Sequence, residues 1–359
     1  GFYPSVNKVF KKNFRRFRMK KVLVIFVIAI AAMTMVFAQS AAETPAQSSG
    51  LEHVDLLLNW TIAADHAPYY VAIKNGWYEE AGLDVNVIIG QGSGYSAQMV
   101  DAGKCDIAIC DAPVVYAYRN NGAAVKLIGI IFDKHPNSMY YYLDTGMQSP
   151  ADVAGKTVAV PPTDGHKVMW PAFASMIGVD PESVEFINID STAKVSALAS
   201  RNADVVFELL TGYPNFDAAM DTSKIGNFLW ADYGFECYAH SYIASDDTCK
   251  NKGDMLDKFL DVTYRAWEWT IMHPEEAIAI LAEYQPINVD ALVKSLYIEQ
   301  SFILTQRYKD NGIGYIDPAG IQATYDLVNT YQVELNYPVE DIYDDSHLPK
   351  IPYTNIVVK

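Results

Sequence analysis

Short apolar runs alternate with helical patterns along most of the chain, and this alternation constrains the fold more than any other feature. The runs are rich in Val, Ile and Leu, and they lie at 54–60, 84–90, 106–111, 126–133, 156–161, 184–190 and 204–210. Near-continuous apolar strands that alternate with helices are typical of parallel sheets covered by helices on both faces. The pattern therefore predicts an α/β protein with mostly parallel sheets.

The first and second series of runs resemble each other. Each contains a strand, a loop, a helix, an Asp and a second strand, in VNVIIGQGSGYSAQMVDAGKCDIAICD and again in VEFINIDSTAKVSALASRNADVVFELL. This internal similarity predicts two α/β lobes. From residue 252 the pattern becomes helical without a clear strand, and we expect these helices to pack on the first lobe as a cap.

The N-terminus has the layout of a secretory signal. Residues 1–38 hold eight Lys or Arg and no acid, and they end in a 17-residue apolar run that closes on Ala38. We expect cleavage after Ala38 and a periplasmic or secreted protein, with 1–18 an upstream extension because Met19 is the better start. A retained membrane anchor is the alternative. Residues 39–50 are polar and small, as in a linker.

The rest of the chain is strongly acidic. The 19 remaining Lys and Arg stand against 43 Asp and Glu, which disfavours binding to nucleic acid or to anionic membranes. The four cysteines show neither a CxxC motif nor zinc-type spacing, so we expect no metal site. Cys237 and Cys249 either pair across a hairpin or remain free thiols.

Ligands of open α/β sheets bind outside the carboxyl ends of the strands, so the residues that follow each run are candidates for a binding site. In the first lobe these are Asn59, Trp60, Asp65, His66, Ser93, Gly94 and Asp111. Trp60 offers a flat apolar face, and the glycine loop before Ser93 offers backbone N–H groups at a helix start. Helix capping is the alternative role for Asp65 and for Ser93.

In the second lobe the candidates are Asp164, Trp170, Glu208 and Tyr213. Glu208 lies within the apolar run DVVFELL, where an unpaired charge is costly, so it should meet a partner from the protein or the ligand. We expect Trp170 and Tyr213 to close an aromatic wall, although Trp170 fits a helix core equally well.

The stretch LLLNWTIAADHAPYYVAIKNGWYEEAGLDVNV resembles the N-terminal signature of the NMT1/THI5-like group of periplasmic binding proteins, and GSGYSAQMVDAGKCDIAI and DVAGKTVAVP resemble later blocks. The resemblance implies a two-lobed, type II periplasmic-binding-protein (Venus-flytrap) fold. It also implies lobe 1 at 51–142 and 240–359, and lobe 2 at 143–239. Members bind sulfonates, taurine, nitrate, riboflavin or thiamine pyrimidine precursors for ABC importers.

The resemblance and the candidate residues together predict a monomeric solute receptor without catalysis or cofactor, whose partners are a small molecule and an ABC permease. Four carboxylates favour a donor-rich heterocycle such as a thiamine-precursor pyrimidine. A taurine, sulfonate or nitrate receptor is a second hypothesis, although it would want Arg or Lys. A third is an anchored solute sensor. A fourth is a pyrimidine synthase that uses His66, which matches the histidine of such enzymes, with a pyridoxal cofactor.

Overall fold

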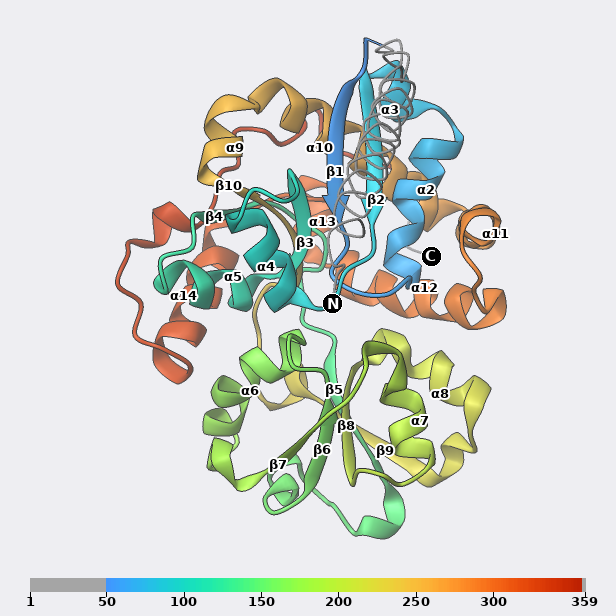
Figure 1. Ribbon diagram of the computed structural model, residues 1–359, viewed down its shortest axis with the longest axis vertical. Helices are drawn as coiled ribbons and strands as arrows, with labels where there is room; N and C mark the ends of the chain where they lie inside the picture. Colours follow the sequence, from blue (N-terminus) through green and yellow to red (C-terminus); the bar gives the residue numbers. More distant parts are fainter. Residues whose placement is uncertain (1–49, 357–359) are drawn as a thin grey trace, which may run out of the picture. The chain divides into compact units, whose positions relative to one another are not determined.

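The computed structural model of the chain describes residues 50–356. The expected signal sequence, its cleavage site at Ala38 and the linker up to residue 49 lie outside the described residues. From Leu51 onward the chain forms one compact unit that contains two five-stranded sheets (Figure 1). Among the described helices, none has both the length and the apolar character needed to cross a bilayer.

The first sheet mixes parallel and antiparallel strands. Its order is β2 (Leu83–Ile88), β1 (Glu52–Leu57), β3 (Ile107–Asp111), β10 (His240–Ser245) and β4 (Val125–Ile130). Strands β2, β1 and β3 are parallel, whereas β10 runs antiparallel to both β3 and β4. The first residue of β10 therefore lies beside the last residue of β3, and His240 pairs with Asp111.

The second sheet repeats this plan. Its order is β7 (Glu185–Asn188), β6 (Thr157–Val160), β8 (Val205–Leu209), β5 (Asn137–Tyr142) and β9 (Ile225–Leu229). Strands β7, β6 and β8 are parallel, and β5 is antiparallel to β8 and β9. The two sheets and their helices confirm the predicted α/β fold with two lobes.

All seven predicted runs correspond to strands, but β5, β9 and β10 were not predicted. The sequences NSMYYY, IGNFL and HSYIAS lack a run of Val, Ile and Leu, which is why they escaped the pattern. Every residue of β5 is buried nonetheless, because the strand lies between β8 and β9. Tertiary position, rather than residue preference, makes these segments strands.

Helices flank both sheets. In the first lobe they are α2 (Ala67–Lys74), α3 (Trp77–Glu80), α4 (Ser93–Asp101) and α5 (Ala112–Asn120). In the second lobe they are α6 (Gly165–Met176), α7 (Lys194–Ala199) and α8 (Tyr213–Ala219). Short 3-10 helices join several of these elements, and two of them, η1 (Ala64–His66) and η6 (Leu210–Gly212), lie near the carboxyl ends of strands.

The C-terminal helices contact both lobes. They are α9 (Asp246–Asn251), α10 (Gly253–Met272), α11 (Pro274–Tyr284), α12 (Val289–Ile303), α13 (Gln306–Asn311) and α14 (Pro318–Tyr331). Helices α10 and α11 pack on α2, as a cap on the first lobe would. Helix α12, however, contacts η1 of the first lobe and both η6 and α8 of the second, and α14 lies against α5 and α6.

The chain crosses between the sheets twice, after β4 and after β9. Because β5 belongs to the second sheet, we propose that lobe 2 begins before Asn137 rather than after Tyr142. We keep its end shortly before His240, where β10 returns to the first sheet. The crossing segments at 131–136 and 230–239 are then the candidate hinge.

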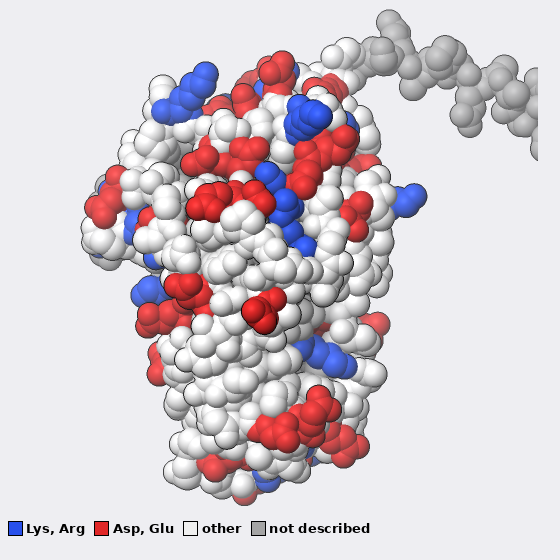
Figure 2. Space-filling view, turned by 90° about the vertical axis from the view of Figure 1, so that its left-hand side faces the viewer, with Lys and Arg blue, Asp and Glu red and all other residues white. Residues whose placement is uncertain are grey.

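Among the charged side chains that Figure 2 displays, acidic ones predominate over basic ones, in keeping with the composition of the chain. All four cysteines are buried and free, so the structure holds no bond between Cys237 and Cys249.

Candidate functional site

A cavity of about 340 Å³ lies between the two lobes. Its lining comes from the carboxyl ends of β1, β3 and β8, the first turns of α4, α6 and α7, the first residue of β10, and helix α12. Both sheets therefore present the ends of their strands to one shared space. This is the position at which ligands bind in open α/β sheets.

The cavity brings seven of the eleven predicted residues together. Those in its lining are Asn59, Trp60, Asp65, Ser93, Asp111, Asp164 and Glu208. His66, Gly94, Trp170 and Tyr213 are not part of the lining.

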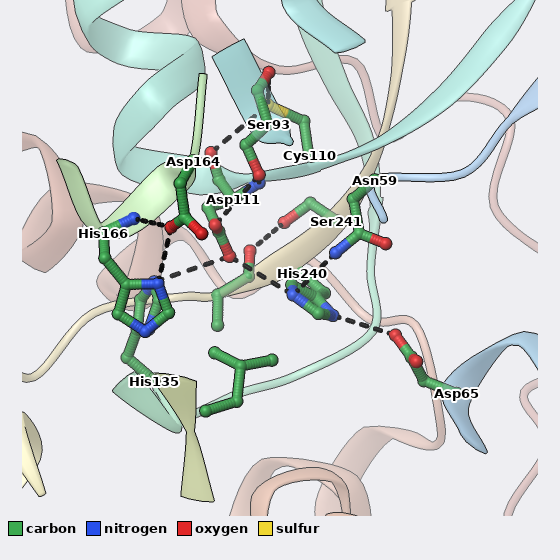
Figure 3. Close-up of polar contacts among 12 residues, drawn as sticks. Asn59, Asp65, Ser93, Cys110, Asp111, His135, Asp164, His166, His240 and Ser241 are labelled. Carbon is green, nitrogen blue, oxygen red and sulfur yellow. Dashed lines mark hydrogen bonds and ion pairs between the residues drawn. The ribbon is translucent and has the colours of Figure 1, made fainter. Parts of the chain in front are cut away.

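On the first-lobe side, a chain of hydrogen bonds runs from His66 to Asp65 through the amide of Asn59 and the ring of His240 (Figure 3 shows Asn59, His240 and Asp65). The Ala63 backbone N–H donates to His66 Nδ1 at 3.0 Å, so His66 Nε2 carries the hydrogen and donates to Asn59 Oδ1. Asn59 Nδ2 then donates to His240 Nε2 at 2.9 Å. His66 is completely buried and orients Asn59 rather than facing the cavity.

His240 is the basic group that faces the first-lobe acids. Its Nδ1 lies 3.0 Å from Asp65 Oδ2, and its Nε2 lies 3.5 Å from Asp111 Oδ1. Burial opposes protonation, but the hydrogen bond to Asp65 and the charges of Asp111 and Asp65 raise the pKa of His240 above its ordinary value. Proton uptake at His240 would remove the acceptor of Asn59 Nδ2, because His240 Nε2 would then carry a hydrogen of its own.

Ser93 hydrogen-bonds to Asp111 rather than facing the cavity as a free donor. The Ser93 hydroxyl donates to Asp111 Oδ2 at 2.9 Å and accepts the Asp111 backbone N–H at 3.0 Å. The other oxygen, Asp111 Oδ1, is buried without a hydrogen-bond partner and faces the ring nitrogens of His240 and His135 at 3.5 and 3.6 Å. Ser93 is thus a support for Asp111, which keeps one acceptor free.

On the second-lobe side, Asp164 is the centre of a buried cluster. It accepts the backbone N–H of His166 at 2.8 Å, which caps α6, and His166 Nδ1 at 2.7 Å. Lys194 Nζ lies 2.7 Å from its other oxygen. Burial opposes ionisation, but the Lys194 ammonium and His166 hold the pKa of Asp164 well below its usual range.

Lys194 joins the two lobes at the cavity. Its ammonium lies 3.5 Å from Glu208 Oε2 and 4.5 Å from the ring centroid of Trp60, which belongs to the first lobe. Burial alone would lower the pKa of Lys194, but the charges of Asp164 and Glu208 raise it, so the side chain stays charged. The sequence predicted that Glu208 has a partner from the protein or the ligand, and in the structure this partner is Lys194.

The glycine loop contacts the second lobe directly. The backbone N–H of Gly94, predicted as a donor to a ligand, instead donates to Thr163 O at 3.2 Å. Gly92 adopts φ +114°, and a Cβ there would lie 2.3 Å from the same carbonyl oxygen. Only glycine fits both the backbone conformation and this close approach.

The predicted aromatic wall is absent from the described lining. Trp170 is 1 % exposed and packs in the core of the second lobe, where its Nε1 donates to Pro181 O at 3.0 Å. Tyr213 begins α8 and stacks against Tyr140. Trp60 is the one Phe, Tyr or Trp among the described lining residues.

Three important lining residues were not predicted: Lys194, His240 and Glu299. His240 begins a strand that the pattern missed, and Lys194 looked like an ordinary surface lysine of a helix. Glu299 carried a visible indication. It lies on α12 in a stripe of buried residues spaced three or four apart, namely Leu292, Ser295, Leu296, Glu299, Phe302 and Ile303. A charged residue in such a stripe predicts that its side chain has a hydrogen-bonding or ionic partner, or that it is uncharged.

Among the described residues, no group of His, Cys, Asp and Glu side chains has a geometry that would hold a metal ion. The carboxylates of the cavity are instead arranged around Lys194 and His240.

Comparisons with known proteins agree with this architecture. The profile of the family described as NMT1/THI5 like matches residues 63–277. A formylaminopyrimidine-binding protein of Halalkalibacterium halodurans is 24% identical over 285 residues, which cover 79% of this chain and 86% of that protein. A 4-amino-5-hydroxymethyl-2-methylpyrimidine phosphate synthase of Legionella pneumophila is also 24% identical, over 87% of this chain and 97% of the synthase.

Among solved structures, the alkanesulfonate-binding protein of Xanthomonas axonopodis pv. citri superposes with a TM-score of 0.63 at 11% identity, covering 81% of this chain and 96% of that protein. At such identity the superposition shows a shared fold, that of periplasmic binding proteins.

Proposed function

Because this chain belongs to the NMT1/THI5-like family, we propose that it is the solute-binding component of an ABC importer and that it captures a small, donor-rich heterocycle related to the thiamine pyrimidine. The observation that carries the proposal is the cavity between the lobes, where Trp60 of one lobe faces Glu208 and Lys194 of the other. A flat aromatic face beside fixed polar groups suits a small heterocycle. The formylaminopyrimidine-binding relative supports this class of solute.

Capture would work by hinge closure. Contacts from both lobes to one solute favour the closed arrangement, and the crossing segments at 131–136 and 230–239 would absorb the rotation. Helix α12 contacts both lobes, so it would limit that rotation. We propose export to the periplasm or cell surface, with an ABC permease as the partner.

The charges of the cavity bear on the solute. Lys194 and His240 face four carboxylates, at Asp65, Asp111, Asp164 and Glu208. The excess of acid disfavours sulfonate, taurine or nitrate, as the sequence suggested. The protein's own basic groups also disfavour a strongly cationic solute, because each of the four carboxylates already lies beside Lys194 or His240. An uncharged heterocycle fits both conditions.

A thermal-shift panel of formylaminopyrimidine, riboflavin and taurine tests the proposal. A compound that binds only the folded protein stabilises it by about 2.7 kcal/mol at a hundredfold excess over its dissociation constant. We expect formylaminopyrimidine to raise the melting temperature. Stabilisation by taurine alone would contradict the proposed solute class, and no stabilisation by any of the three would contradict it as well.

A pyrimidine synthase is the second candidate, favoured by the Legionella relative. Two observations weigh against it: both ring nitrogens of His66 are bonded within the protein, and the cavity lysine, Lys194, is ion-paired with Asp164. An imine requires an uncharged amine. Incubation with pyridoxal phosphate should therefore give no Schiff-base absorbance, and its appearance would favour the enzyme.

A further inference from the structure

Helix α12 brings a carboxyl group to the cavity that none of the ion pairs accounts for. Glu299 is 2 % exposed and lines the cavity, and its Oε2 has no hydrogen-bond partner. The other polar residue that α12 contributes, Ser295, donates to its own helix at Ala291 O. Among the α12 residues in the lining, Glu299 is the one with a side-chain polar atom that lacks a hydrogen-bond partner.

The surroundings of Glu299 favour the uncharged acid. Burial raises its pKa well above the usual value, and the negative charge of Asp65 on η1 raises it further, while a hydrogen bond with the Asp65 backbone acts in the opposite direction. The other ionisable groups of the cavity are Asp111, His240, Asp164, His166, Lys194 and Glu208. His240, His166 and Lys194 are each paired with other acids, so no basic group of the described lining compensates a charge on Glu299.

We infer that Glu299 enters the cavity as an uncharged carboxylic acid and that its Oε2–H donates a hydrogen bond to the bound solute. The inference rests on the proposed function in one respect, that a solute occupies this cavity. A buried polar group without a partner is costly, and a hydrogen bond to the solute removes that cost.

Two further unpartnered atoms in the lining define the complementary chemistry. Asp111 Oδ1 is a carboxylate acceptor. His166 Nε2 is also unpartnered. In the neutral ring the hydrogen is on Nδ1, which donates to Asp164, so Nε2 is an acceptor. A solute that satisfies the set offers one acceptor to Glu299 and donors to Asp111 and His166. An uncharged amino-substituted nitrogen heterocycle has this combination.

Infrared difference spectroscopy tests the protonation directly. The spectrum of the wild type minus that of Glu299→Gln at neutral pH should show the carbonyl band of a protonated carboxyl group, which carboxylates lack. Adding the panel compound that binds should move this band, because its hydroxyl becomes a donor. A difference spectrum with carboxylate bands only would overturn the inference, whether or not any solute binds.

Affinity measurements test the contact. Using whichever compound of the panel (formylaminopyrimidine, riboflavin or taurine) binds the wild type, Glu299→Met should weaken binding about tenfold, because the donor is lost. Glu299→Gln keeps an N–H donor and should stay within about threefold of the wild type. Glu268→Gln is the matched control, since Glu268 is also buried but bonds to Asn355 outside the cavity.

Unchanged binding in Glu299→Met would overturn the inference. Failure of the proposed function is seen separately, as a lack of stabilisation of the wild type by the whole panel. The infrared band then still decides whether Glu299 carries a proton.

Discussion

The two sides of the cavity set different basic groups beside their acids. In the first lobe Asp65 and Asp111 face an imidazole, His240, whereas in the second lobe Asp164 and Glu208 face the ammonium of Lys194. An imidazole gains or loses its proton near neutral pH, but a lysine with a raised pKa does not. The imidazole that the first-lobe acids share is therefore sensitive to pH, and the ammonium that the second-lobe acids share is a fixed electrostatic scaffold.

Removing Lys194 should have the largest effect. Lys194→Met leaves Asp164 buried with His166 as its one basic neighbour among the described residues, and loss of one partner of a buried ion pair costs about 3–5 kcal/mol. Urea unfolding should show this loss. Lys294→Met removes an exposed pair with Asp217 and should cost under about 1 kcal/mol. Equal losses of unfolding free energy in the two variants would show that Lys194 does not act as a scaffold.

Trp60 tests a second difference between the sides, because the first lobe alone supplies an aromatic face to the described lining. Trp60→Ala should weaken formylaminopyrimidine binding by about 1–3 kcal/mol, the usual value of a stacked base. Isothermal titration calorimetry measures the change. Trp77→Ala is the control, since Trp77 lies outside the cavity against Trp269 and should leave the affinity unchanged. Wild-type affinity in Trp60→Ala would place the solute elsewhere.

His240 should give the smallest effect, and one that varies with pH. Because its pKa is raised in the folded state, the stabilisation from its proton is present below about pH 6.5 and is lost as the pH rises through the folded pKa. The difference in unfolding free energy between the wild type and His240→Gln should therefore shrink between about pH 6 and pH 9. The difference in unfolding free energy should change by about 1.4 kcal/mol for each unit by which the pKa of His240 is higher in the folded than in the unfolded state.

The exposed His273 supplies the control for this measurement. His273→Gln removes an exposed imidazole outside the cavity and is measured at the same two pH values. A pH-independent difference for His240→Gln would mean that the imidazole and the ammonium of the cavity do not differ in their response to pH.

Sequence reasoning identified the first-lobe residues better than the rest of the site. Asn59 and Asp111 lie at the ends of apolar runs, and such runs predict strands reliably enough to locate their carboxyl ends. Glu208 was found because a charge within an apolar run is costly. His240 was missed because β10 owes its strand conformation to its place between β3 and β4, which no local pattern encodes.

The basic partners of the four carboxylates were missed for the same reason. Four carboxylates suggested a donor-rich ligand. The basic groups that pair with them, Lys194 and His240, come from segments distant in the sequence. Lys194 lies 30 residues after Asp164, and His240 lies 175 residues after Asp65. Which acids remain available to a solute is a property of the packed structure. The unpartnered atoms of Asp111, His166 and Glu299 could be recognised only there.

The contact between the glycine loop and Thr163 involves backbone atoms of both lobes, and no side chain with an unpartnered atom takes part in it. Part of the free energy that holds the lobes together is thus independent of any solute. The apparent affinity of a two-state receptor scales with the fraction of molecules already competent to bind. Substitutions at this contact would therefore retune the concentration range over which the receptor responds, while leaving its selectivity untouched.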